Sequence, residues 1–167
     1  MAIRVLRPAR LSPAELDRYL VEGWFRIGQA LMSCHAVLFE GVLRSAIWTR
    51  LPLADHRFRK SNRKLLARND RRYTTEVGPA RIDAARERLY QRYRATVRGD
   101  RSPTLDDFLY GDSERDIFDT WEICVRDDAQ QIVAFSWFDR GHTTLQSLVG
   151  VYEPALKSHS LGYYTML

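Results

Sequence analysis

The stretch W-E-I-C-V-R-D-D-A-Q-Q-I-V-A-F-S-W-F-D-R, residues 121–140, decides the fold of this chain. Two runs rich in β-branched and aromatic residues flank the turn D-D-A-Q, and this pattern is typical of a β-hairpin. A third such run, Thr143 to Tyr152, ends at the turn Glu153–Pro154. The sequence therefore predicts adjacent antiparallel strands over residues 121–152. Because side chains alternate between strand faces, Phe135 and Trp137 are expected on one face, opposite to Ser136 and Phe138.

Outward from this stretch, helical and strand signals alternate. Residues 12–15 form an S-x-x-E capping box with a proline at the first helical position, and Gly23 is expected to end that helix. Apolar residues repeat at helical spacing over residues 82–97. The other predicted elements are strands over 2–7, 24–28, 31–40, 42–53 and 72–77, and helices over 61–69 with Ser61 as the cap, 102–109 and 160–167.

This mixture of strands and helices predicts an α/β (α+β) fold. We expect a twisted mixed sheet of about five to seven strands with helices on both faces. At 167 residues the chain is expected to form a single domain over residues 1–167.

The composition, with 45% hydrophobic and 28% charged residues, is ordinary for a globular protein. No apolar run is long enough to span a bilayer, and Met1 to Arg10 lack an apolar signal core, so we expect no membrane partner and a cytoplasmic protein. Cys34 and Cys124 form no C-x-x-C pair and are expected as buried reduced thiols. The four histidines show no ligand spacing, so no metal site is predicted.

The positive charge is concentrated in one segment. The chain carries a net charge of +5, and residues 57–72 contain eight basic residues and one acid, Asp70, so the remainder is slightly acidic. A single basic patch of this kind favours a polyanionic partner over general solubility.

Several motifs resemble one family when they are taken in order. They are S-N-R-K-L-L-A-R-N (61–69), L-Y-Q-R-Y (89–93), I-V-A-F-S-W-F-D-R (132–140), V-Y-E-P (151–154) and S-L-G-Y-Y (160–164). In this order and spacing the chain resembles the arginyl/leucyl-tRNA–protein transferases over about residues 45–167. The resemblance implies an acetyltransferase-like fold that is used without acetyl-CoA, with aminoacyl-tRNA as the co-substrate and no separate cofactor.

The chain also departs from the family pattern. The family carries clustered cysteines before the basic segment, where this chain has L-R-S-A-I-W-T-R-L (43–51). The family continues into further strands past the position of Leu167, so we expect the C-terminal strands of the fold to be missing. An uncovered edge near residues 143–152 is then expected, and with it a homodimer through that edge.

The resemblance implies a reaction between the N-terminal amine of a protein with an acidic first residue and the ester of arginyl- or leucyl-tRNA, as in the N-degron pathway. Such an amine has a pKa near 7.7–8.0 and the ester is already activated, so positioning and modest proton removal suffice. The basic segment is expected to bind tRNA phosphates through Arg63, Lys64, Arg68 and Asn69.

Carboxylates at strand positions are the candidate general bases, namely Asp139 and Glu122, with a salt-bridge role as the alternative. Arg140 and Arg44 are the candidate ligands of the acidic N-terminal residue. The backbone of Ser160 and Gly162 is expected to bind substrate. The aromatic residues of the late strands are expected in the core, with stacking of one of them on the terminal adenine as the alternative.

Two alternatives remain open. An acyl-CoA-dependent N-acyltransferase would need a glycine-rich loop where this chain has H-S-L-G (159–162), with one glycine. A non-catalytic RNA- or protein-binding remnant would bind its partner without any transfer of arginine or leucine.

Overall fold

The computed structural model describes residues 3–99 and 101–167 and divides the chain into two compact units, each built from three separate stretches. The first unit comprises Met1–Thr49, Arg98–Asp119 and Asp139–Gln146, and the second comprises Arg50–Val97, Thr120–Phe138 and Ser147–Leu167.

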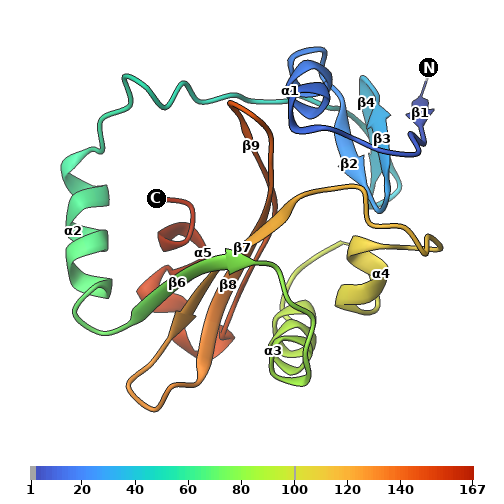
Figure 1. Ribbon diagram of the computed structural model, residues 1–167. Coiled ribbons are helices and arrows are strands. Elements are labelled where there is room, and N and C mark those ends of the chain that lie inside the picture. Colours follow the sequence, from blue (N-terminus) through green and yellow to red (C-terminus); the bar gives the residue numbers. More distant parts are fainter. Residues whose placement is uncertain (1–2, 100) are drawn as a thin grey trace. The chain divides into compact units, whose positions relative to one another are not determined.

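The first unit contains short strands and two helices (Figure 1). Its elements are β1 (Arg4–Leu6), α1 (Pro13–Val21), β2 (Phe25–Ile27), β3 (Ala30–Ser33), β4 (Ala36–Phe39), β5 (Val42–Ser45) and α4 (Leu105–Leu109). The second unit contains α2 (Lys60–Asn69), β6 (Thr74–Pro79), α3 (Ala84–Arg94), β7 (Thr120–Arg126), the 3-10 helix η1 (Pro154–His159) and α5 (Leu161–Tyr164). Two strands, β8 (Ile132–Arg140) and β9 (Leu145–Tyr152), contribute residues to both units.

The largest sheet in the described part of the chain has four strands in the order β6-β7-β8-β9. β6 and β7 are antiparallel, with Thr74 opposite Arg126. The connections from β7 to β8 and from β8 to β9 are a few residues long, too short for a parallel crossover. The predicted antiparallel strands over 121–152 and the α+β class are therefore confirmed.

This sheet is smaller than the five to seven strands expected from the sequence. The strands that precede residue 50 pair among themselves, as a three-stranded sheet β1-β3-β2 and a hairpin β4-β5. The predicted hairpin turn at Glu40–Gly41 is confirmed, because both residues have positive φ angles of 50° and 74°, as a two-residue hairpin loop requires. The sequence pattern indicated strand structure in this region, but it merged β3 and β4 into one strand and did not indicate which strands would pair.

Helices cover both faces of the four-stranded sheet, as expected. Trp137 Nε1 donates to Glu122, on the face that α3 covers, while the hydroxyl of Ser136 hydrogen-bonds Thr165 beyond α5. The predicted alternation along β8 is thereby confirmed. Val125 and Ala134 pack with Leu161 and Tyr164 to form the core on the α5 face.

Several boundaries differ from the predictions, and the single strand predicted over 31–40 is two strands, β3 and β4, which lie in different sheets. α2 begins at Lys60 after Arg59, which makes no side-chain cap, so Ser61 lies inside the helix and is not its cap. Residues 46–53 form no strand, and the C-terminal helix is the four-residue α5, not a helix to Leu167. β1 confirms the middle of the strand predicted over 2–7, whose first residue lies outside the described residues.

Two other predictions concern α1 and the cysteines. The capping box is present at α1, where the Ser12 hydroxyl accepts from the Glu15 backbone and the Glu15 carboxylate accepts from the Ser12 backbone. Cys34 and Cys124 are buried free thiols, and burial raises the pKa of Cys124. Within residues 3–99 and 101–167, no helix has the length and apolar character needed to cross a membrane.

Candidate functional site

Helix α2 presents the basic residues of the sequence motif on its surface. Arg63, Lys64 and Arg68 are all exposed, and the first turn of the helix contains no acidic residue. Arg63 Nη1 donates to the carbonyl of Phe58 at 2.6 Å, which holds the guanidinium near the start of the helix. An exposed helix face with several cations and no acid attracts phosphate groups.

The last turn of α2 binds the loop that precedes α5. Arg68 Nη2 and Asn69 Nδ2 both donate to the backbone carbonyl of His159, at 3.0 and 2.9 Å. Asn69 is fully buried, and its Oδ1 has no hydrogen-bond partner among the described residues. Asn69 is therefore a positioning residue for residues 159–161 and cannot contact a phosphate directly while it stays in this place.

The ring of His159 is held from both sides. Arg72 Nη1 lies 3.3 Å from Nε2, and because a guanidinium only donates, Nε2 accepts. Nδ1 of the same ring hydrogen-bonds the hydroxyl of Tyr73. Burial raises the pKa of Tyr73, so its hydroxyl stays protonated at neutral pH.

Ser160 has a left-handed backbone, with φ 54° and ψ 41°, which is uncommon for a residue with a side chain. Its carbonyl accepts from the backbone N–H groups of Tyr163 and Tyr164, at 3.1 and 2.9 Å. This strained residue therefore sets the direction in which α5 leaves the loop, and strained residues of this kind cluster at functional sites.

Gly162 lets α5 approach the sheet closely. A Cβ atom at Gly162 would lie 3.0 Å from the ring of Tyr152 on β9, and a Cβ atom at Gly150 would lie 3.8 Å from the carbonyl of Gly162. The glycine in S-L-G therefore leaves room for the ring of Tyr152.

We expect the Gly162→Ala variant to lose about 1–3 kcal/mol of unfolding free energy, because the added methyl overpacks this contact. Gly78→Ala is the matched control, since a Cβ atom there meets nothing within 4 Å. Urea denaturation of both variants measures the difference. Equal midpoints for the two variants would show that Tyr152 moves aside without cost.

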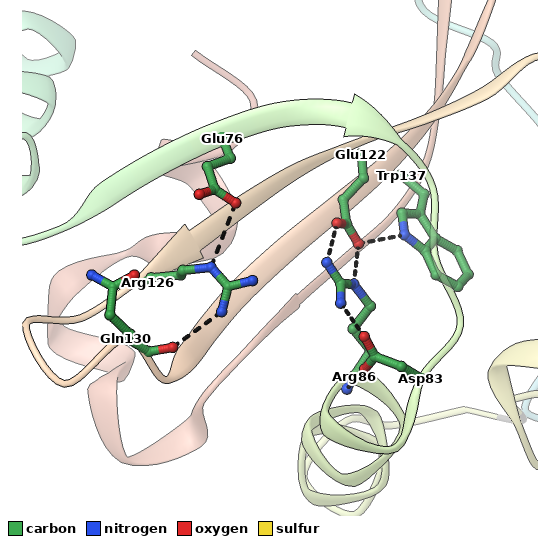
Figure 2. Close-up of polar contacts among 7 residues, drawn as sticks. All are labelled: Glu76, Asp83, Arg86, Glu122, Arg126, Gln130 and Trp137. Atoms are coloured by element: carbon green, nitrogen blue, oxygen red, sulfur yellow. Dashed lines mark hydrogen bonds and ion pairs between the residues drawn. The ribbon is translucent and has the colours of Figure 1, made fainter.

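Glu122 lies in a buried ion pair, not at a surface. It is 4% exposed, and its two oxygens accept from Arg86 Nε and Nη2 at 2.6 and 2.5 Å (Figure 2). Trp137 Nε1 donates to the same carboxylate at 3.0 Å, and Asp83 also pairs with Arg86. The bonds from Glu122 raise the pKa of Arg86. This geometry matches the salt-bridge alternative for Glu122.

Asp139 has a comparable place in the first unit. It is fully buried, and its Oδ1 lies 2.7 Å from Arg26 Nη1. The neighbouring Arg140 is exposed and pairs with Asp119 at 2.8 Å, and Arg44 is exposed on β5. These three candidates therefore belong to the first unit, whereas the other seven belong to the second.

The sequence did not single out His159, Tyr73 and Arg72 as one cluster. Arg72 stood in the basic segment, but the tyrosine and histidine had no spacing that marked them.

Two motifs are also joined by contacts that the sequence did not predict. Arg92 Nη2 of L-Y-Q-R-Y pairs with the carboxylate of Glu153 in V-Y-E-P at 2.8 Å.

Comparison with known families agrees with these motifs. Residues 85–167 match the family model described as arginine-tRNA-protein transferase, C terminus. No curated protein sequence matches the chain closely enough to count as a relative. The matched region contains α3 from its second residue onward, all of β7 to β9, and the His159 loop, but not the basic helix α2.

Proposed function

Since residues 85–167 belong to the arginine-tRNA-protein transferase C-terminal family, we propose that this chain is an aminoacyltransferase domain that moves arginine or leucine from charged tRNA to a protein. The acceptor is the N-terminal amine of a protein whose first residue is acidic, as in the N-degron pathway. In the reaction the neutral amine attacks the ester carbonyl, an amide forms, and the 3′-oxygen of the tRNA leaves as a hydroxyl after taking up a proton.

One observation supports this proposal beyond the family match. The basic helix α2 lies outside the matched region, yet its Arg68 and Asn69 hydrogen-bond the carbonyl of His159, inside it. The cationic helix α2 is thus hydrogen-bonded to His159, the residue directly before the S-L-G segment. We assign tRNA phosphate binding to Arg63 and Lys64, and positioning of the loop to Arg68 and Asn69.

We assign binding of the acidic N-terminal residue to Arg44 and Arg140, and binding of substrate to the Ser160–Gly162 backbone. Because an N-terminal amine is partly neutral at neutral pH, a strong base is not required. Glu122 and Asp139 are proposed to act chiefly as salt-bridge partners of Arg86 and Arg26, each of which stabilises its own unit. The acetyltransferase-like topology and a homodimer through the β9 edge belong to the same proposal, since β9 ends the four-stranded sheet of the described residues.

The Arg63→Gln/Lys64→Gln variant is expected to bind tRNA about tenfold more weakly at moderate salt. We also plot the logarithm of its affinity against the logarithm of the salt concentration. The slope of this plot should become less steep by about 0.9 for each duplex phosphate that the variant no longer neutralises. Filter binding over a salt series measures both quantities. Arg81→Gln/Arg88→Gln is the control, because it removes the same charge from exposed residues away from α2.

Transfer is tested separately from binding. Labelled arginine or leucine on tRNA is offered with peptides that begin with aspartate, glutamate or alanine, and acetyl-CoA is offered in parallel. Label in the acidic peptides supports the proposal. Binding of tRNA without transfer favours the non-catalytic alternative, and acetylation favours the acyl-CoA enzyme.

A further inference from the structure

We propose that Tyr163 is a stacking platform for an unpaired nucleotide at the 3′ end of the tRNA, an inference that rests on the function proposed above. Among the described residues of the second unit, Tyr163 is the only aromatic side chain (Phe, Trp or Tyr) in the exposed class, and 49% of its surface is exposed. The aromatic residues that the sequence offered for stacking are less accessible, since Phe135 and Trp137 are fully buried and Tyr152 packs against Tyr93.

The neighbour of Tyr163 explains why its ring stays outside. Tyr164 is 7% exposed and packs in the core of the second unit. Its hydroxyl donates to Asp70 Oδ1 at 2.7 Å and lies 3.1 Å from Thr75 Oγ1. Because consecutive residues of a helix point about 100° apart, anchoring Tyr164 directs Tyr163 away from the core.

Tyr163 lies beside the cationic start of α2. Its hydroxyl is 3.4 Å from Oδ1 of Asn62, in the first turn of the helix. Arg59 precedes Asn62 by three residues, so the two lie on neighbouring positions of the helix surface, and Arg63 follows Asn62 directly in the first turn. Both of these basic side chains, Arg59 and Arg63, are exposed. An aromatic face next to cations is the arrangement by which proteins bind single-stranded nucleic acid without reading its sequence.

A single exposed ring is common on protein surfaces and would mean little alone. Here the ring is fixed from two directions. The left-handed Ser160 accepts the N–H of Tyr163, and the His159 before it is held by the last turn of α2. The first turn of the same helix contacts the tyrosine hydroxyl. These hydrogen bonds hold the aromatic ring of Tyr163 at the basic helix, where a nucleotide base can stack on it.

The experiment uses the full chain and a tRNA whose terminal adenosine is replaced by 2-aminopurine, whose fluorescence falls when it stacks. With the wild-type protein we expect quenching on binding, and Tyr163→Phe should preserve it. Tyr163→Ala and Tyr163→Leu should abolish the quenching and weaken binding roughly tenfold, within the range for loss of one stacked base. Met166→Ala, at a 66% exposed position of the same segment, should change neither.

A second tRNA, without its unpaired 3′ nucleotides, separates this inference from the proposed function. If Tyr163 stacks on the 3′ end, wild type and Tyr163→Ala bind this shortened tRNA equally well. Normal quenching with Tyr163→Ala, while tRNA binding still depends on Arg63 and Lys64, would overturn the stacking role alone. If the wild-type protein binds neither tRNA, the proposed function fails, and the inference fails with it.

Discussion

Replacing Glu122 with glutamine is expected to lower the free energy of unfolding by about 3 kcal/mol, as when one member of a buried ion pair is removed. Glu122 and Arg86 are each 4% exposed, and Glu122 accepts two bonds from Arg86 and one from Trp137. The amide group of glutamine would face one of these donors with a donor of its own. Urea denaturation followed by tryptophan fluorescence measures the loss.

Glu76→Gln is the matched control, because it makes the same change in a second arginine–glutamate pair on the same sheet (Figure 2). Arg126 Nε lies 3.5 Å from Glu76, whose side chain is 60% exposed. Exposed pairs contribute about 0–1 kcal/mol, so this variant should unfold close to the wild-type midpoint. If both variants lose the same amount, burial does not set the strength of the Glu122 pair.

Replacing Arg26 with methionine is expected to cost about 3–5 kcal/mol, because the side chain makes three separate buried interactions. It bonds Asp139 Oδ1 at 2.7 Å and the carbonyls of Gly28 and Leu109 at 2.7 and 2.9 Å. The double variant Arg26→Met/Asp139→Leu should recover part of the loss, because it also removes the buried carboxylate. Thermal and urea unfolding of wild type, the two single variants Arg26→Met and Asp139→Leu, and the double variant completes the cycle.

The same position separates a structural Asp139 from a catalytic one. With Asp139→Asn, transfer should fall only in proportion to the folded fraction if Asp139 acts as the partner of Arg26. A general base at this position would instead show a roughly 10²–10⁴-fold loss in a fully folded variant. Transfer assays at low temperature, with the folded fraction measured by circular dichroism, distinguish the two results.

Local patterns in the sequence predicted local structure well. The capping box at Ser12, the turn at Glu40–Gly41 and the alternation at Phe135 to Phe138 depend on neighbouring residues alone, and the structure confirms them. The number of strands in the main sheet was overestimated, because pairing between strands depends on residues far apart in the chain. The helix cap at Ser61 was wrong, since α2 starts earlier, at Lys60, without a side-chain cap.

The candidate site was predictable as a set of motifs but not as a set of contacts. The basic residues of α2 are exposed as their charge required. Nothing in the spacing of Asn69 and His159, ninety residues apart, indicated that one would bind the carbonyl of the other. Likewise, the pairing of Glu122 with Arg86 follows from the packing of α3 on the sheet, and a strand position alone does not reveal it.

The interleaving of the two units has a consequence for synthesis of the protein. Each unit takes residues from three stretches, and the second needs Ser147–Leu167. During translation the ribosome must therefore release the chain as far as Leu167 before that unit closes, and until then its sheet and helices remain partly assembled and prone to aggregation. Contacts between distant stretches also slow folding. We expect chaperones to raise the yield of this protein more than they would for one whose domains follow each other along the sequence.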